Sequence, residues 1–243
     1  MPRVERLPRK IAGRSGRRPD GRQGEVRLPA ALAVLVAIGL YAALPNSLLL
    51  GPRYVIPTIE VLLLIPLIAI NPTRLTRETR WSRIVSLGLA YLIIVANLVA
   101  LGMLLHALTS SHVTQGRQLL LAALQVWITD IIAFGLVYWE LDRGGAVART
   151  SRARAQLQRA DFRFTQDEDD DTVNEVAAGS SAVSDWVPTF VDYLYVSITN
   201  STAFSPTDTM PLSHRAKLLM SVEAIAALVT SLLVIARAVS ILH

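Results

Sequence analysis

The chain contains no cysteine among its 243 residues, which excludes disulfide bonds, thiolate metal ligands and cysteine nucleophiles. Histidine is scarce, and the four histidines are too scattered along the chain to build a metal site. The sequence also lacks the glycine-rich nucleotide-binding motifs, the H-E-x-x-H motif of zinc proteases and the G-x-S-x-G motif of serine hydrolases. We therefore predict that the protein is not an enzyme and that it binds no metal and no cofactor.

Charged residues are also few, at 18% of the chain, against about 25% in an average soluble domain. Hydrophobic residues make up 52% and gather in long runs. A helix needs roughly 20 apolar residues to cross a bilayer core. Five runs approach or exceed this length: Leu28–Leu50, Tyr54–Ile70, Ile84–Leu108, Leu119–Trp139 and Ala216–Leu242. The runs predict an all-α fold, a polytopic bundle with five transmembrane helices in the plasma membrane of a bacterium, and the lipid bilayer as its partner.

The net charge of +5 is distributed in a way that orients these helices. Residues 1–29 carry nine basic residues against three acidic ones, and residues 71–83 and 142–185 hold two further groups of arginines. Cytoplasmic loops carry an excess of Lys and Arg, so all three regions and the N-terminus are predicted to be cytoplasmic. No aromatic residue is interleaved in the basic arm, which favours contact with anionic lipid over nucleic acid. Tyr138 and Trp139, at the end of the fourth run, are predicted to form an interfacial belt.

A sixth segment, DWVPTFVDYLYVSITNSTAF (185–204), is apolar but interspersed with polar residues. Asp192, Tyr195, Thr199 and Thr202 recur at helical spacing and form one stripe. The segment either crosses the membrane or enters it and returns as a short re-entrant, pore-like helix, and both alternatives stay open. The predicted organisation is a disordered basic arm (1–27), a four-helix region (28–140), a charged cytoplasmic loop (141–185) and a C-terminal module (186–243).

Ionisable residues within the apolar runs are candidate functional groups, because a charge at membrane depth costs roughly 2.5–3.5 kcal/mol on insertion scales. We single out five of them: Glu60, Asp130, Asp192, Glu223 and Arg237. Each has a functional interpretation, as part of an ion or proton path, and a structural one, as a partner that holds helices together. We expect Asp192 and Glu223 to hold the 186–204 helix against the last helix, and Arg237 either to pair with Asp130 or to reach the interface.

The stretch 190–242 resembles the pore module of two-helix potassium-type channels. The residues that carry the resemblance are the Thr-rich end of the 186–204 helix, Asp208, Pro211-Leu212-Ser213 and Glu223. It implies a permeation path lined by Thr199, Thr202, Ser205 and Asp208. The filter position reads Ala203-Phe204-Ser205-Pro206, in place of the Gly-Tyr-Gly or Gly-Phe-Gly of potassium filters, so the resemblance does not extend to potassium selectivity.

The whole chain also resembles a family of actinobacterial integral membrane proteins that has no established activity, through GPRYVIP (51–57), YWELDRGG (138–145) and TAFSPTDTMPLS (202–213). Three hypotheses about function follow. The first is an ion-channel-like protein that passes monovalent cations, as a homo-oligomer around 186–242. The second is a non-conducting membrane scaffold or interaction protein. The third is a proton-coupled carrier that uses Glu60 and Asp130.

Overall fold

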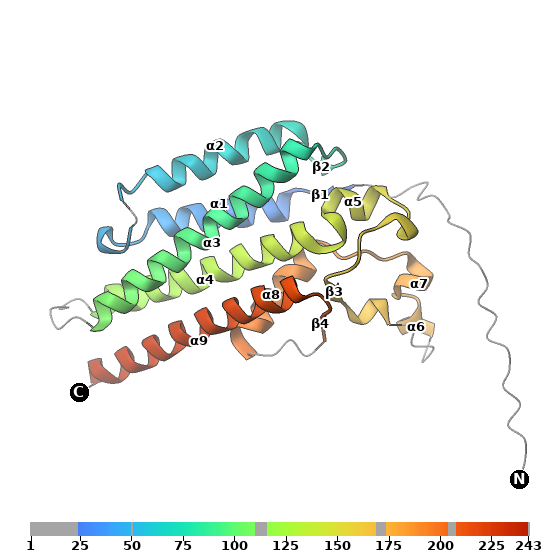
Figure 1. Ribbon diagram of the computed structural model, residues 1–243. Helices are drawn as coiled ribbons and strands as arrows, with labels where there is room; N and C mark the ends of the chain where they lie inside the picture. Colours follow the sequence, from blue (N-terminus) through green and yellow to red (C-terminus); the bar gives the residue numbers. More distant parts are fainter. Residues whose placement is uncertain (1–23, 50, 110–115, 169–173, 204–207, 243) are drawn as a thin grey trace, which may run out of the picture.

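The computed structural model describes residues 24–49, 51–109, 116–168, 174–203 and 208–242, which are mostly helical (Figure 1). Within these ranges, three helices are long and apolar enough to cross a membrane: α3 (Arg80–Thr109), α4 (Gly116–Leu141) and α9 (His214–Leu242). The prediction of an all-α fold is confirmed.

Two of the five predicted spans are shorter helices. α1 (Leu28–Ala42) and α2 (Val55–Ile70) have 15 and 16 residues, or about 23 and 24 Å at 1.5 Å per residue, less than the roughly 30 Å of a bilayer core. The first helix ends early because Pro45 has no N–H to continue it. A short 3₁₀ turn, η1 (Asn46–Leu48), follows. Five single helices of full spanning length are therefore not observed in the described residues.

α4 is the centre of the bundle, because it packs against α1, α3, α8 (Phe190–Ala203) and α9. Tyr138 and Trp139 do not form an exposed belt, since they are only 0% and 5% exposed. The chain that follows Leu141 folds back over them, which the apolar run itself could not indicate.

One end of the bundle, called the inner end below, holds the start of α1 and the end of α4. There β1 (Glu25–Val26) pairs antiparallel with β2 (Arg74–Leu75), so the segments before α1 and after α2 lie side by side. The indole N–H of Trp139, near the end of α4, donates to the carboxylate of Glu25 in β1. The first two helices thus form a hairpin that starts and finishes at the inner end.

α8 also begins at the inner end, where the backbone N–H of Phe190 donates to Glu25 at 2.6 Å. After α8 the chain comes back to the same end, because β4 (Met210–Pro211) pairs antiparallel with β3 (Phe162–Arg163). The backbone N–H of Asp161, just before β3, donates to Asp142 just after α4, which fixes β3 at the inner end. The segment 186–213 therefore leaves one end of the bundle and returns to it.

The helix start within this segment differs from the expected one. α8 begins at Phe190, and the carboxylate of Asp192 accepts hydrogen bonds from the backbone N–H and the hydroxyl of Thr189, as in a helix capping box. Where α8 packs against α4, Gly135 of α4 allows a close approach, since a Cβ at this position would lie 3.2 Å from the Cα of Leu194.

The loop predicted over 141–185 is folded into short elements wherever the structure describes it. They are η2 (Asp142–Gly144), α5 (Ala146–Ser151), η3 (Arg154–Gln156), β3, η4 (Thr165–Asp167), α6 (Asn174–Ala177) and α7 (Ser181–Ser184). The loop packs on the inner end through Phe162 and Phe164, which are 1% and 5% exposed. It is therefore a structured layer on the bundle in its described parts.

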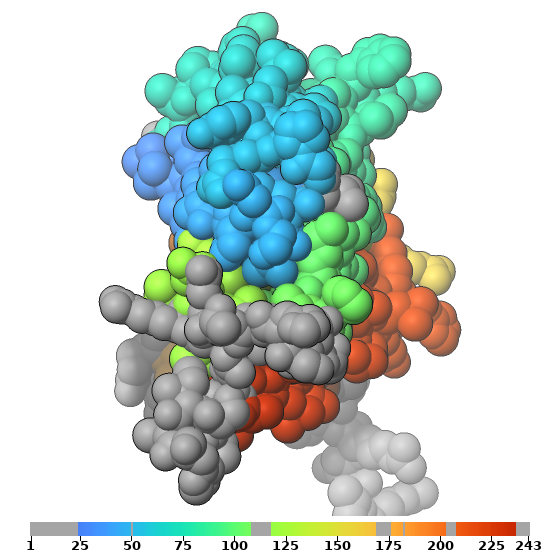
Figure 2. Space-filling view, turned by 90° about the vertical axis from the view of Figure 1, so that its left-hand side faces the viewer, coloured from blue at the N-terminus to red at the C-terminus, as the bar shows by residue number. Residues whose placement is uncertain are grey.

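Apolar side chains cover the outside of the helices as well as the core. Exposed large hydrophobic residues occur on α1, α2, α3, α4 and α9, for example Leu35, Leu62, Val95, Leu124 and Ile225. The view along the bundle shows α1 and α2 stacked above α4, with α9 on the opposite side (Figure 2). Such a belt is unfavourable in water and favourable in lipid.

Candidate functional site

The carboxyl group of Glu223 is the best-connected polar group inside the bundle. It is 0% exposed and lies on α9, two and a half turns from the helix start. Its Oε2 accepts hydrogen bonds from the Tyr138 hydroxyl and the Asn200 amide, both at 2.6 Å. Its Oε1 accepts from the hydroxyls of Ser197 and Ser201. A single side chain on α9 is thus bonded to α4 and α8, the two helices packed beside it.

A second buried carboxyl group, Asp130 on α4, is less completely bonded. It is 3% exposed, and its Oδ1 accepts a hydrogen bond of 3.1 Å from the amide of Asn97 on α3. The same amide donates to the carbonyl of Val126 at 3.0 Å. The other oxygen, Oδ2, is buried and has no hydrogen-bond partner among the described residues.

Asp130 and Glu223 lie near each other in the bundle. The Ser197 hydroxyl, which donates to Glu223, also lies 2.8 Å from the carbonyl of Ile131, the residue after Asp130. Both residues lie where α3, α4, α8 and α9 meet, in the apolar interior. A carboxyl oxygen without a hydrogen-bond partner is costly there unless it is protonated or binds a cation. We call Asp130, Tyr138, Ser197, Asn200 and Glu223 the buried carboxyl cluster.

The other predicted intramembrane residues lie apart from this cluster or outside the description. Glu60 is buried on α2, with an Oε2 that has no hydrogen-bond partner in the described chain. Asp192 bonds to Thr189 in its own segment, and no hydrogen bond or ion pair joins it to α9 among the described residues. Arg237 lies in α9, and its side chain falls outside the described residues.

The residues predicted to line a permeation path do not converge on the buried carboxyl cluster. The hydroxyl of Thr199 donates to the carbonyls of Tyr195 and Val196, and that of Thr202 donates to Ile198, all within α8. Ser205 lies outside the described residues, and Asp208 is exposed. The stripe that meets α9 is instead Ser197, Asn200 and Ser201, one or two positions away on the same helix.

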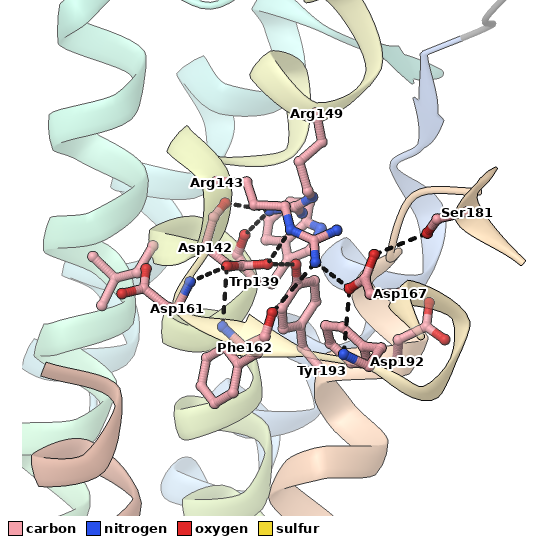
Figure 3. A network of polar contacts seen from close by, with 12 residues as sticks. Trp139, Asp142, Arg143, Arg149, Asp161, Phe162, Asp167, Ser181, Asp192 and Tyr193 are labelled. Carbon is pink, nitrogen blue, oxygen red and sulfur yellow. Dashed lines mark hydrogen bonds and ion pairs between the residues drawn. The ribbon is translucent and has the colours of Figure 1, made fainter. Parts of the chain in front are cut away.

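The inner end carries a second polar network, which sequence reasoning missed (Figure 3). The carboxylate of Asp142 accepts hydrogen bonds from the Tyr193 hydroxyl at 2.5 Å and from the backbone N–H of Asp161 at 2.6 Å. The carboxylate of Asp161 in turn accepts a bidentate pair of hydrogen bonds from Arg215, at the start of α9. These contacts join α4, α8, α9 and β3.

Arg149 is at the centre of this network, with a side chain that is 0% exposed. It donates to the carbonyls of Trp139 and Asp142 at 2.7 and 2.9 Å, and so satisfies the last turn of α4. Its guanidinium lies 4.8 Å from the centre of the Tyr193 ring and 3.8 Å from the carboxylate of Glu25. The turn that brings it there has positive φ angles at Arg143, Gly144 and Gly145, and glycine adopts such angles at little cost at the last two positions.

Glu25 is the carboxylate of this network that lies before α1, and its side chain is buried. Its side chain is only 7% exposed, and this burial raises the pKa of Glu25 above its ordinary value of 4.5. The charge of Arg149 and the hydrogen bonds from Phe190 and Trp139 act in the opposite direction. The sequence signals for this network were the Gly144-Gly145 pair and the aromatic residues Phe162 and Phe164 in a charged loop.

The two networks differ in what they can do chemically. The inner-end network has charged groups of both signs, so its role is to fix the loop and the start of α8. The buried carboxyl cluster has acidic groups and neutral donors, and one open carboxyl oxygen. No group of three or more metal-ligating side chains occurs in the part of the chain that the structure describes. Comparison with protein-family models, curated proteins and solved structures found no match.

Proposed function

We propose that the protein is a multipass membrane protein in which α1, α2, α3, α4 and α9 cross the bilayer and α8 enters from the cytoplasmic side and returns. The exposed apolar side chains on all five helices support this arrangement. The short α1 reaches the far end with its following turn, because Leu44 and Leu48 pack with Leu104 and Leu119. Residues 71–83 and the described parts of 142–185, both rich in arginine, lie at the inner end, which the positive-inside rule assigns to the cytoplasm.

We further propose that the protein moves a monovalent cation, with the proton as the first candidate, past the buried carboxyl cluster. One observation carries this proposal: the Oδ2 atom of Asp130 is buried and has no hydrogen-bond partner among the described residues. Ionisable residues at membrane depth face the bundle interior and mark ion and proton paths. Tyr138 and Ser197 add hydroxyl groups that can both donate and accept protons.

This proposal differs from a path through the channel-like module, and one experiment separates the two. The purified full-length chain is reconstituted into liposomes with a pH-sensitive dye inside, and a membrane potential is applied. Proton influx above that of empty liposomes is expected for the native chain and for Asp208→Asn, and it is expected to fall to the empty-liposome level for Asp130→Asn. Loss in Asp208→Asn with retention in Asp130→Asn would overturn the proposal in favour of the module.

A non-conducting scaffold is the second candidate, and a specific observation favours it. The carboxylate of Glu223 is hydrogen-bonded on both oxygens, as expected of a group that holds helices together. In the scaffold, no flux of protons, Na⁺ or K⁺ is expected in the liposome experiment for any variant.

A further inference from the structure

A cavity of about 70 Å³ opens at the inner end between α1, α2, α3 and α4. Its floor is apolar and is built from small and branched side chains, including Ala31, Val34, Leu64 and Ala90. A cavity needs about 10–15 Å³ to hold one water molecule, so this space is large enough for more than one. The cavity is separate from the buried carboxyl cluster, none of whose members lines it.

The mouth of the cavity is polar and carries charges of both signs. Arg27, Arg77 and Arg83 line it together with Glu78 and Glu140. Arg83 is already engaged, since it donates to the carbonyl of Gly144 and lies 3.9 Å from Glu78. The remaining guanidinium groups, those of Arg27 and Arg77, have no ion pair with a described residue.

Arg27 is the most informative of these groups. It is 8% exposed, and its NH1 group donates to the carbonyls of Leu67 and Asn71 at the end of α2. Its Nε is buried and has no hydrogen-bond partner among the described residues. Glu140, across the cavity, is 8% exposed and close enough to interact with Arg27 electrostatically, but no ion pair joins the two in the described structure. A buried donor and a buried carboxylate therefore face the same space.

We propose that this cavity binds a phospholipid with a primary-ammonium headgroup, with its phosphate on Arg27 and Arg77 and its ammonium group toward Glu78 and Glu140. The charges of the ligand complement those of the mouth, since an anion alone would meet the two glutamates and a cation alone would meet the arginines. A primary ammonium group donates hydrogen bonds to carboxylates, which a quaternary ammonium group cannot do. The apolar floor takes the start of an acyl chain.

The position of the cavity fits this ligand. It lies at the starts of α1 and α3 and at the end of α4, which is headgroup depth on the cytoplasmic side in the proposed membrane arrangement. The inference depends on that arrangement but not on ion movement, because lipid binding is measured without a membrane potential. A failure here therefore leaves the transport proposal intact, and a failure of transport leaves this one intact.

The test is native mass spectrometry of the delipidated full-length protein in detergent, with equal amounts of phosphatidylethanolamine, phosphatidylcholine and phosphatidylglycerol added. A charged hydrogen bond contributes about 1.5–3 kcal/mol, so we expect the ethanolamine lipid to bind roughly tenfold or more tightly than the choline lipid. Equal binding of the ethanolamine and choline lipids, or preference for the glycerol lipid, would overturn the proposal. Displacement of the lipid by soluble phosphoethanolamine at equal concentration would show that the acyl chain does not contribute to binding, against the proposal.

Matched variants assign the effect to the cavity. Arg77→Gln removes an exposed guanidinium at the mouth and is expected to weaken ethanolamine-lipid binding, whereas Arg80→Gln, an equally exposed neighbour outside the cavity, is expected to leave it unchanged. Glu140→Gln is expected to abolish the preference over the choline lipid. Ala31→Leu, which fills the apolar floor, is expected to reduce binding of all three lipids. Equal binding by Arg77→Gln and Arg80→Gln would show that the mouth is not the site.

Discussion

The carboxylate of Glu25 accepts a hydrogen bond of 2.6 Å from the backbone N–H of Phe190, a residue 165 positions further along the chain. The contact joins the segment before the first helix to the first turn of α8. The same carboxylate accepts from the indole of Trp139 and lies 3.8 Å from Arg149. One side chain therefore holds the first turn of α8 next to the end of α4 and the segment before α1.

Removal of this carboxylate is expected to destabilise the inner end. Glu25→Ala leaves the buried guanidinium of Arg149 without its carboxylate and frees the donors of Trp139 and Phe190. Breaking a buried pair costs about 3–5 kcal/mol, so a large fall in the thermal unfolding midpoint in detergent is expected. The control is Glu168→Ala, which removes an exposed partner of Arg163 and should cost about 1 kcal/mol or less. Equal effects of the two substitutions would contradict the role of Glu25.

The raised pKa of Glu25 also predicts a pH dependence. Because burial raises the folded-state pKa above 4.5, the folded protein holds this proton more tightly than the unfolded chain does. The resulting stability is present below pH 4.5 and is lost as the pH rises through the folded pKa. The difference in unfolding midpoint between the native chain and Glu25→Gln, measured over roughly pH 4 to 8, should therefore shift in favour of Glu25→Gln as the pH rises. A constant difference would show that Glu25 does not titrate differently in the folded state.

The hydrogen bonds between α8 and α9 are expected to contribute more to stability than those that stay within α8. Glu223→Ala removes the acceptor of the buried Tyr138 hydroxyl, at about 1–3 kcal/mol. It also removes one of the two acceptors of the Asn200 amide, which still donates to the carbonyl of Met220. Thr199→Ala and Thr202→Ala remove hydroxyls that bond only within α8, and each should change stability by about 0.5 kcal/mol or less. Chemical unfolding in detergent measures both. A large cost for Thr202→Ala with none for Glu223→Ala would reverse the assignment of the faces.

The return of the chain after α8 is testable by labelling, because the native sequence has no cysteine. Leu212 and Arg159 are at the inner end, and Tyr54, which is 70% exposed, is at the other end before α2. Single cysteines at positions 159 and 212 should react with a membrane-impermeant maleimide only after the cells are opened, and a cysteine at 54 should react in intact cells. Labelling of 212 together with 54 would mean that α8 crosses the membrane completely.

The long helices were predictable from sequence, because α3, α4 and α9 follow long apolar runs whose ends lie within a few residues of the helix ends. The end of α1 at Ala42 was harder to predict, since apolar residues continue through Leu44 and resume at Leu48. Glu60, Asp130 and Glu223 stand out in sequence as acidic residues in apolar surroundings. Which of them are partnered depends on packing between distant helices.

The stripe on α8 illustrates why the site itself was only partly predictable. Thr199 and Thr202 share a face, and so do Ser197, Asn200 and Ser201, and both faces have helical spacing. The spacing alone carries no information on which face meets α9. The orientation of α8 depends on its packing against α4, where Gly135 allows Leu194 to approach closely. The inner-end network escaped prediction because its partners, Asp142 and Arg149, lie in a segment whose charge is typical of a solvated loop.

The pairing of β3 with β4 has a consequence for the two ends of the chain. If α8 had crossed completely, six crossings would have placed both ends in the same compartment. Because the chain comes back to β3, the proposed arrangement has an odd number of crossings. The segment before α1 then faces the cytoplasm, while α9 carries the C-terminal residues to the cell exterior, where a fused reporter enzyme would meet an extracellular substrate.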